Sequence, residues 1–177
     1  MLRLYSKVIL FFLVCLNFNI YSQSDNFYSS SSILSKLEKL NTLGKVLYVA
    51  AHPDDENTRL ITYLSNEKKY ETAYLSLTRG DGGQNLIGKD LKENLGLIRT
   101  QELLEARKID GGIQLFTSAI DFGYSKTSKE SLEFWDEDQI LYELVWIIRK
   151  FKPDVIITRF NQTSGITHGH HTASSIL

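Results

Sequence analysis

The stretch VLYVAAHPDDE at residues 46–56 indicates how this chain folds, because an apolar run ends abruptly in a polar turn. Residues 46–51 are all apolar and include two valines and a tyrosine, as expected of a strand that is buried on both faces of a sheet. The next five residues supply one histidine, one proline and three acidic side chains. The stretch therefore predicts a buried strand with a polar site at its carboxyl end.

Further strands and helices alternate along the chain beyond this stretch. The hydrophobic pattern predicts strands at residues 72–78, 113–116 and 155–158, and helices at residues 33–40, 57–68, 95–108, 139–151 and 172–177. Strict alternation of strand and helix implies right-handed crossovers and a mainly parallel sheet with helices on both faces. We therefore expect an α/β fold of the Rossmann-like kind.

The two ends of the chain fall outside this pattern. Residues 1–22 carry Arg3 and Lys7 ahead of a short apolar run, which predicts a secretory signal peptide and export to the periplasm or the extracellular space. An uncleaved anchor is the alternative, although the run is short for a membrane span. Residues 23–44 read as a polar tether and a short helix, and residues 45–177 as the domain. The chain stops inside a predicted helix, so we expect this domain to be truncated at its C-terminus.

Composition narrows the function classes. The net charge is −1 and basic residues are dispersed, so nothing favours binding to nucleic acid or to an anionic membrane. Cys15 is the only cysteine and lies within the predicted signal peptide. The mature chain would then have no thiolate, and a bound metal would need histidine, aspartate or glutamate ligands. The partner expected is a small molecule or a glycan, and the oligomeric state stays open.

All four histidines lie in segments that follow two of the predicted strands, where ligands bind in sheets of this kind. His52 and Asp55 are three residues apart at a strand-to-helix turn and can converge on one ion. The third ligand must come from the C-terminal histidines, in which His168 and His171 share a face if a helix begins there. Asp54 is then free to act as general base toward water activated by the metal, and His168 can stabilise an oxyanion and protonate a leaving amine.

The element at residues 51–56, AHPDDE, together with the distant His168-x-x-His171, resembles the PIG-L/LmbE-like zinc-dependent N-deacetylases. These enzymes remove acetyl groups from substrates of the N-acetylglucosamine type. Residues 78–80 and the pattern Arg99-x-x-Glu102-x-x-x-Ala106 also match. The resemblance implies that the zinc ligands are His52, Asp55 and His171. It also implies that Asp54 is the general base and that His168 is the acid that stabilises the oxyanion. Fe²⁺ or cobalt could occupy the same ligands.

The chain departs from this family between the distal histidines. Gly169 and His170 stand where members often have a proline and an acidic residue, so His170 competes with His171 as third ligand, and we favour His171. Candidate substrate contacts are Arg79, Arg99 and Asp121. For Arg99 a helix-surface salt bridge with Glu102 is an equal alternative. The glycine-rich residues 79–85 either pack near the sugar site or form a tight turn, and the aromatic residues of a predicted loop, Tyr124 and Trp135, either stack on a sugar or anchor the loop.

Three functional hypotheses follow. The first is metal-dependent hydrolysis of the N-acyl group of an amino-sugar substrate. The second is a related amidase whose acyl group is larger or whose amine is not a sugar. The third is a non-catalytic fragment of the same fold that binds carbohydrate, although Asp54 argues against it because binding alone needs no base.

Overall fold

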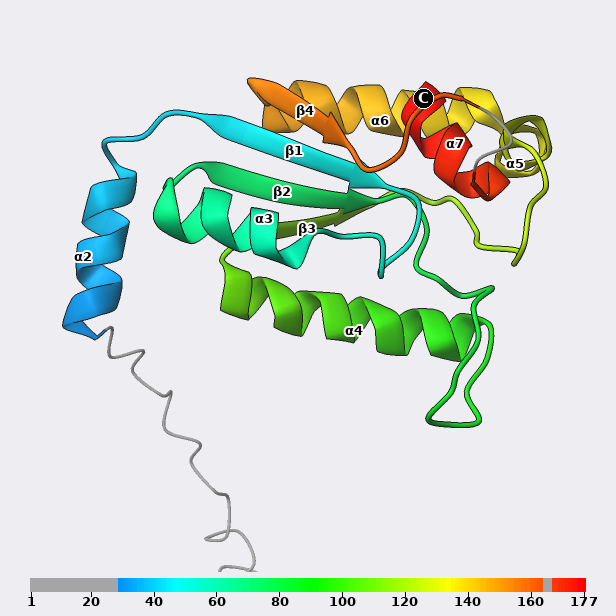
Figure 1. The fold of residues 1–177 in the computed structure, drawn as a ribbon, viewed down its shortest axis with the longest axis horizontal. Coiled ribbons are helices and arrows are strands. Elements are labelled where there is room, and N and C mark those ends of the chain that lie inside the picture. The colour runs from blue at the N-terminus through cyan, green and yellow to red at the C-terminus, as the bar shows by residue number, and fades with distance from the viewer. Residues whose placement is uncertain (1–28, 164–166) are drawn as a thin grey trace, which may run out of the picture. The chain divides into compact units, whose positions relative to one another are not determined.

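The computed structural model describes residues 29–163 and 167–177 as an alternation of helices and parallel strands (Figure 1). Contacts divide the chain into Met1–Ile33 and Leu34–Leu177, and the strands found among the described residues all lie in the second unit. The strands are β1 (Lys45–Ala50), β2 (Glu71–Ser76), β3 (Ile113–Phe116) and β4 (Val155–Thr158). The helices are α2 (Ser30–Lys39), α3 (Thr58–Thr62), the π-helix η1 (Tyr63–Glu67), α4 (Glu93–Asp110), α5 (Ser128–Trp135), α6 (Glu137–Phe151) and α7 (Gly169–Ile176).

The four strands form one sheet in the order β3-β2-β1-β4, and each neighbouring pair is parallel. After β1 the chain adds β2 and then β3 on one side of it. The chain then crosses back and places β4 on the other side of β1. The carboxyl ends of β1 and β4 therefore lie next to each other at the point where the strand order reverses. Ligands bind at such a point in open α/β sheets.

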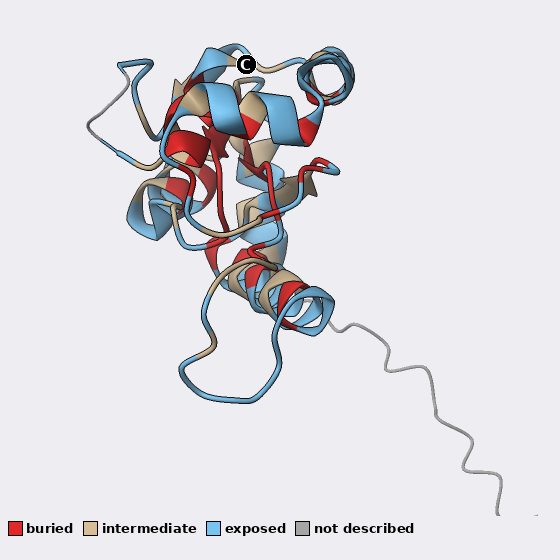
Figure 2. Cartoon of the chain, turned by 90° about the vertical axis from the view of Figure 1, so that its right-hand side faces the viewer, coloured by how far each residue is buried: buried red, intermediate tan, exposed pale blue. Residues whose placement is uncertain are grey.

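Alternate residues of the strands pack into two apolar cores, one on each face of the sheet. Leu47 and Val49 of β1 pack with residues of α5, α6 and α7, whereas Tyr48 and Ala50 pack with Ile61 and Leu103, which belong to α3 and α4. Buried residues are concentrated in β1 and β2 and in the helix faces turned toward them, whereas β3 and β4 have none (Figure 2). The predicted α/β fold with helices on both faces of a parallel sheet is confirmed.

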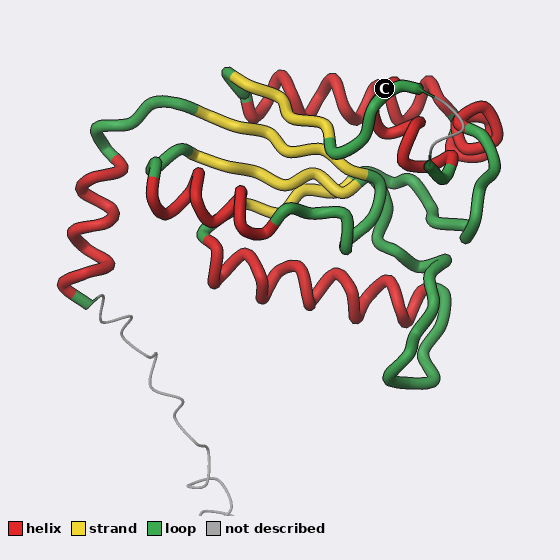
Figure 3. The backbone as a smooth tube through the Cα atoms, in the orientation of Figure 1, coloured by secondary structure: helices red, strands yellow, loops and turns green. Residues whose placement is uncertain are grey.

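Two elements differ from the sequence prediction. The predicted helix at 57–68 is α3 followed directly by η1, so its second half is wound as a π-helix. The segment expected to be a long aromatic loop contains α5, visible as a separate helical turn in the tube (Figure 3). Trp135 belongs to α5, is buried, and donates its Nε1–H to the carbonyl of Ile120 at 2.8 Å. Trp135 thus anchors the segment and is not available to stack on a sugar.

The N-terminal predictions lie mostly outside the described residues. The predicted signal peptide, residues 1–22, is among the undescribed residues, and so is most of the predicted tether. Helix α2 begins at Ser30, inside the stretch expected to be tether, so the helix starts three residues before Ile33. Within residues 29–163 and 167–177, no helix combines the length and the apolar character needed to cross a bilayer.

Candidate metal centre

The site lies where β1 and β4 end side by side. The backbone leaves β1 at Ala50 and turns at once through residues 52–55, and Asn57 then caps α3 by accepting a hydrogen bond from the amide of Leu60 at 3.1 Å. After β4 the chain reaches α7, which carries His170 and His171 in its first turn and has His168 as its N-cap. Sheet topology thus brings together two segments that are more than one hundred residues apart in sequence.

His52, Asp55 and His171 offer one ligand atom each within 4.8 Å of one another. The Asp55 carboxylate lies between the two rings, with Oδ2 at 3.1 Å from His52 Nδ1 and Oδ1 at 3.4 Å from His171 Nε2. The backbone amide of His52 also donates to Asp55 Oδ2 at 2.8 Å, and the ring of His171 stacks on Phe160 with centroids 3.8 Å apart. The side chains of Asp55 and His171 therefore each have a second contact that fixes their direction.

The surroundings of Asp55 keep its carboxylate ionised. Burial acts to raise its pKa, but hydrogen bonds and positive charge from His171 and His52 outweigh burial and hold the pKa well below its usual range. An ionised carboxylate beside two imidazoles is a donor set that divalent zinc accepts. These residues therefore form a candidate metal-binding cluster.

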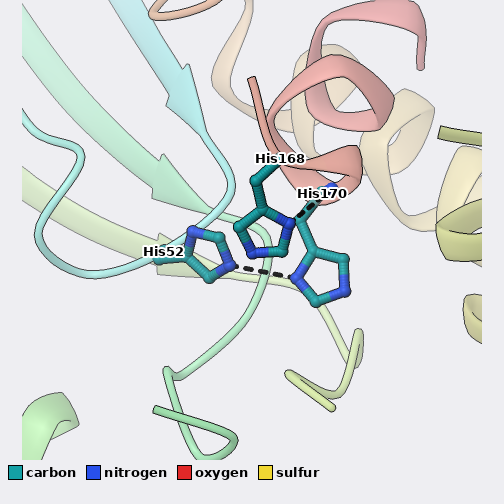
Figure 4. Close-up of side chains that lie close together, drawn as sticks. All are labelled: His52, His168 and His170. Carbon is teal, nitrogen blue, oxygen red and sulfur yellow. Dashed lines mark hydrogen bonds between the residues drawn. The ribbon is translucent and has the colours of Figure 1, made fainter. Parts of the chain in front are cut away.

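A second set of three, His52, His168 and His170, also brings its ring nitrogens within 4.8 Å (Figure 4). His52 Nε2 lies 3.0 Å from His170 Nδ1, on the side of the ring opposite to Asp55. His170 is completely buried, and burial, followed by the positive charge of His52, His168 and His171, lowers its pKa to about 3. His170 is therefore a neutral imidazole in this arrangement.

His168 caps α7 with its ring. Its Nδ1 faces two backbone amides, those of Ser125 and His170, each at 3.4 Å. A ring nitrogen that accepts from an amide carries no proton, so the neutral ring holds its proton on Nε2. Burial and then the charge of His52 lower the pKa of His168. The ring of Tyr124 stacks on it with centroids 5.4 Å apart.

One cavity of about 780 Å³ opens over this cluster. Seven of the eight residues singled out from the sequence line it, namely His52, Asp54, Asp55, Arg99, Asp121, His168 and His171. Glycines and polar residues of the loop after β2 and of α4 complete its lining, together with four apolar side chains: Leu86, Ile87, Leu95 and Ile98. His170 is not part of the lining.

Asp54 is the most exposed of the acidic residues that follow β1, with 73% of its side chain accessible, and its Oδ1 pairs with Arg99 Nη2 at 3.1 Å. The partner of Arg99 is thus Asp54, and the salt bridge with Glu102 considered from the sequence is not the one formed. Arg99 reaches Asp54 beneath the loop at Gly80 and Gly83. A Cβ atom at Gly80 would lie 2.7 Å from the guanidinium, and Gly80 has a positive φ of 70°. A side chain there would displace Arg99 and strain the backbone.

Arg79 is the predicted site residue that the structure places elsewhere. Its guanidinium lies 4.2 Å from the ring centroid of Phe116 and donates to the Thr100 hydroxyl at 3.0 Å, outside the cavity over the cluster. The side chain therefore packs β3 against α4, and its expected contact with substrate is not supported. Asp121 lies at the cavity wall, where its Oδ1 accepts from the amide of Gly123 at 2.8 Å and lies 3.8 Å from His170 Nδ1.

Sequence reasoning missed a buried ionic network beneath the site. Arg107 of α4 pairs with Glu56 at 2.6 Å and with Asp110 through two nitrogens at 2.5 and 3.1 Å. Glu56 ends the polar turn that carries the predicted ligands, so this network ties that turn to α4. Tyr74 of β2 adds a short hydrogen bond from its hydroxyl to the carbonyl of His52. The sequence does contain Glu56, an acidic residue directly after Asp55, but only the fold shows that its partner is Arg107.

Comparison with known proteins gives both a family and a fold. The sequence matches the family described as PIG-L, GlcNAc-PI de-N-acetylase, over residues 47–176. No curated protein matches the chain. Among solved structures, the hydratase GalB, a 4-carboxy-2-hydroxymuconate hydratase from Pseudomonas putida KT2440, superposes with a TM-score of 0.60 at 18% identity, covering 75% of this chain and 52% of that one. An N,N'-diacetylchitobiose deacetylase from Pyrococcus horikoshii superposes with a TM-score of 0.59 at 19% identity, covering 86% of this chain and 58% of that one.

The chain thus spans between 52% and 58% of the length of these two structures, and the identity is low enough that the likeness shows the fold alone. The family match is the stronger finding because it includes the polar turn after β1 and the histidines of α7. It covers most of the chain. The chain therefore belongs to the PIG-L family, described as GlcNAc-PI de-N-acetylase.

Proposed function

We propose that this chain is a metal-dependent hydrolase that removes an N-acyl group, acetyl in the simplest case, from an amino-sugar substrate. The observation that carries the proposal is the convergence of His52, Asp55 and His171 at the floor of one cavity, with Asp54 at its wall. The family description, a de-N-acetylase, supports the same reaction class.

The donor set fits zinc. Two imidazoles and one ionised carboxylate are among the combinations that catalytic zinc sites use, leaving a coordination position for water or substrate. His52, Asp55 and His171 would hold the metal, and Fe²⁺ also accepts nitrogen and oxygen ligands of this kind. When bound, such a metal supplies Lewis acidity toward a carbonyl oxygen and lowers the pKa of water.

Two further residues handle the proton and the negative charge that develop in this reaction. Asp54 accepts a proton from the attacking water, and Arg99 fixes the carboxylate by binding Oδ1. His168 offers an Nε2–H donor in the same cavity, since its Nδ1 is occupied by backbone amides. In the neutral ring that donor hydrogen-bonds to the acyl oxygen and stabilises its negative charge. The proton that Asp54 takes from water is the one that passes to the leaving amine. Atoms balance as acetate and a free amine, with one water consumed.

The cavity lining favours a second candidate within the same chemistry. Leu86 and Ile87 are 93% and 98% exposed at the cavity wall, and Leu95 and Ile98 line it beside them. A cavity of about 780 Å³ with this apolar wall has room for more than an acetyl group. An amidase that takes a longer acyl chain or an amine with an apolar group is therefore the alternative. The fold itself does not decide the reaction, since one similar structure is named as a hydratase.

The test combines metal content with product release. The chain would be loaded with zinc, its metal measured by elemental mass spectrometry, and acetate release followed with N,N'-diacetylchitobiose and N-acetylglucosamine conjugates. Asp54→Asn is expected to keep the metal and lose activity by a factor of at least about 100. Asp138→Asn, which alters an exposed carboxylate of α6 outside this cavity, is the matched control and should retain activity.

The outcomes separate the hypotheses. Activity that survives in Asp54→Asn would remove the proposed base. Release of longer acyl chains in preference to acetate would favour the amidase. A chain that binds zinc and chito-oligosaccharide without releasing acetate would instead be a carbohydrate-binding fragment.

Export is a separate proposal that rests on residues 1–22 of the sequence. We expect the mature protein to begin near Gln23 in the periplasm or outside the cell. Its substrate would then be a glycan or glycoconjugate of that compartment. Mass measurement of the protein recovered from a native-like host would give a chain shortened by the signal peptide, or the full mass if the segment is retained.

A further inference from the structure

His170 is the most deeply buried of the histidines and the one without a place in the mechanism above. It is inaccessible to solvent, and its ring lies between Trp135 of α5 and Phe122, with ring centroids 4.7 and 4.5 Å away. Its Nδ1 lies 3.0 Å from His52 Nε2 (Figure 4), while its Nε2 has no hydrogen-bond partner among the described residues. Asp121 Oδ1 lies 3.8 Å from the same Nδ1, which is too far for a hydrogen bond, so His52 is the one hydrogen-bond partner of this ring among the described residues.

The two nitrogens of His52 face different neighbours. Nδ1 faces Asp55 at 3.1 Å, and the other oxygen of Asp55 faces His171 at 3.4 Å. A metal shared with Asp55 and His171 would therefore use the lone pair on His52 Nδ1. The neutral ring must then carry its proton on Nε2, and this proton points at His170 Nδ1.

The direction of the hydrogen bond follows from this tautomer. His52 Nε2–H donates, so His170 Nδ1 must accept, and the proton of His170 lies on Nε2 between the aromatic rings. The reverse arrangement, with His170 donating, would place the His52 proton on Nδ1 and remove the lone pair that the metal needs. His170 Nδ1 thus accepts the proton of His52 on the side of that ring away from Asp55, so it is not free to bind the same metal. The His170 ring also does not line the cavity.

We propose that His170 is a positioning residue of the metal centre, which accepts the Nε2–H of His52 and thereby fixes the tautomer and the ring orientation that present Nδ1 to the metal. The proposal rests on the metal site of the proposed function and assigns His171, rather than His170, as the ligand from α7. Partners of this kind commonly account for about 10–100-fold in metal affinity. Here the partner is a neutral imidazole clamped by Trp135 and Phe122.

The test uses substitutions that separate the acceptor from the ring. His170→Asn places an amide oxygen at the δ position, close to where Nδ1 stands, so the acceptor is kept and the ring removed. His170→Leu fills part of the space without any acceptor, and His170→Phe keeps a ring without an acceptor should the leucine variant fail to fold. Thr172→Val is the matched control, because Thr172 is equally buried in α7 and its hydroxyl has no partner among the described residues.

Zinc affinity is measured by competition with a chromophoric chelator, and Co²⁺ absorption is recorded on the same variants. His170→Leu is expected to bind zinc about 10–100-fold more weakly than wild type. His170→Asn is expected to recover most of that loss with an unchanged cobalt spectrum, and Thr172→Val to match wild type. Thermal unfolding without metal shows whether a variant is folded before its affinity is compared.

Three results would overturn the proposal, and they differ from one another. If His170→Leu binds zinc as tightly as wild type, the positioning role is wrong while the metal site stands. If His170→Asn loses stoichiometric metal and His171→Ala keeps it, His170 is a ligand. If the folded wild-type chain takes up neither zinc nor cobalt, the proposed function fails together with this inference.

Discussion

Replacing Arg107 by methionine would remove the cation that two buried carboxylates share. Arg107 and Asp110 each have 5% of their side chain exposed and Glu56 has 11%, so little water reaches the three groups. Breaking a buried ion pair by deleting one partner costs about 3–5 kcal/mol, because the remaining charge is left without compensation. For a chain of this size we expect the melting temperature to fall by roughly 6–20 °C.

Urea unfolding followed by circular dichroism at neutral pH gives the change in the free energy of unfolding. Lys108→Met is the matched control, since Lys108 is the next residue of α4 and its pair with Glu105 is 69% and 64% exposed. That control should lie within about 0.5 kcal/mol of wild type. A loss below about 1 kcal/mol in Arg107→Met would refute the reasoning that Arg107 stabilises the turn carrying Glu56.

Three other predictions concern the cap of α7, the loop after β3 and the metal. Gly169→Ala would place a Cβ 2.3 Å from the carbonyl oxygen of Thr127, and we expect a loss of about 1–3 kcal/mol in urea unfolding; an unchanged midpoint would contradict it. Burial raises the pKa of Glu143, but hydrogen bonds from Ser118 and Gln139 outweigh burial and lower the pKa. Glu143 therefore contributes its full stabilisation of the fold above the ordinary glutamate pKa of about 4.3, and this contribution is lost as the pH falls through the lower pKa of the folded state. Glu143→Gln should therefore flatten the decline of stability between about pH 5 and 3 in pH-dependent unfolding, and an identical slope would count against it. Zinc at about 100 times its Kd should stabilise the folded chain by about 2.7 kcal/mol in thermal unfolding, and an equal effect in His171→Ala would argue against the ligand set.

The strands and long helices could be predicted because each is a continuous apolar or periodic run. Residues 113–116 and 155–158 were predicted with the bounds that the structure has, and the others within three residues at each end. Helix α5 was missed although its start carries a capping signal, with Thr127 accepting from the amide of Glu130 at 3.2 Å and Glu130 accepting from the amide of Lys126. The sequence prediction placed this segment in one aromatic loop, whereas Tyr124 precedes α5 and Trp135 is its last residue.

The sequence could predict which residues make up the site but not which of them contact one another. That polar residues gather after β1 and β4 follows from the parallel topology, and the sequence predicts it. The partner of Arg99 depends on the rotation of α4 and on the path of the loop at Gly80. Both are set by tertiary packing and cannot be predicted from the local sequence. Likewise, the separation of His170 from His171 depends on where α7 begins, because adjacent residues of a helix point about 100° apart.

His52 and His170, on the two segments that meet at the site, stand 118 positions apart along the chain, and the bond from Lys45 to Asp154 at the opposite end of β1 spans 109. Closing a loop of that length costs the unfolded chain about 4 kcal/mol of entropy. Contacts so distant in sequence form late, after local helices and the β1–β2 pair. An ion bridging β1 and α7 would therefore act as a removable cross-link. It would slow unfolding at the β1–β4 seam while leaving the earlier folding steps unchanged.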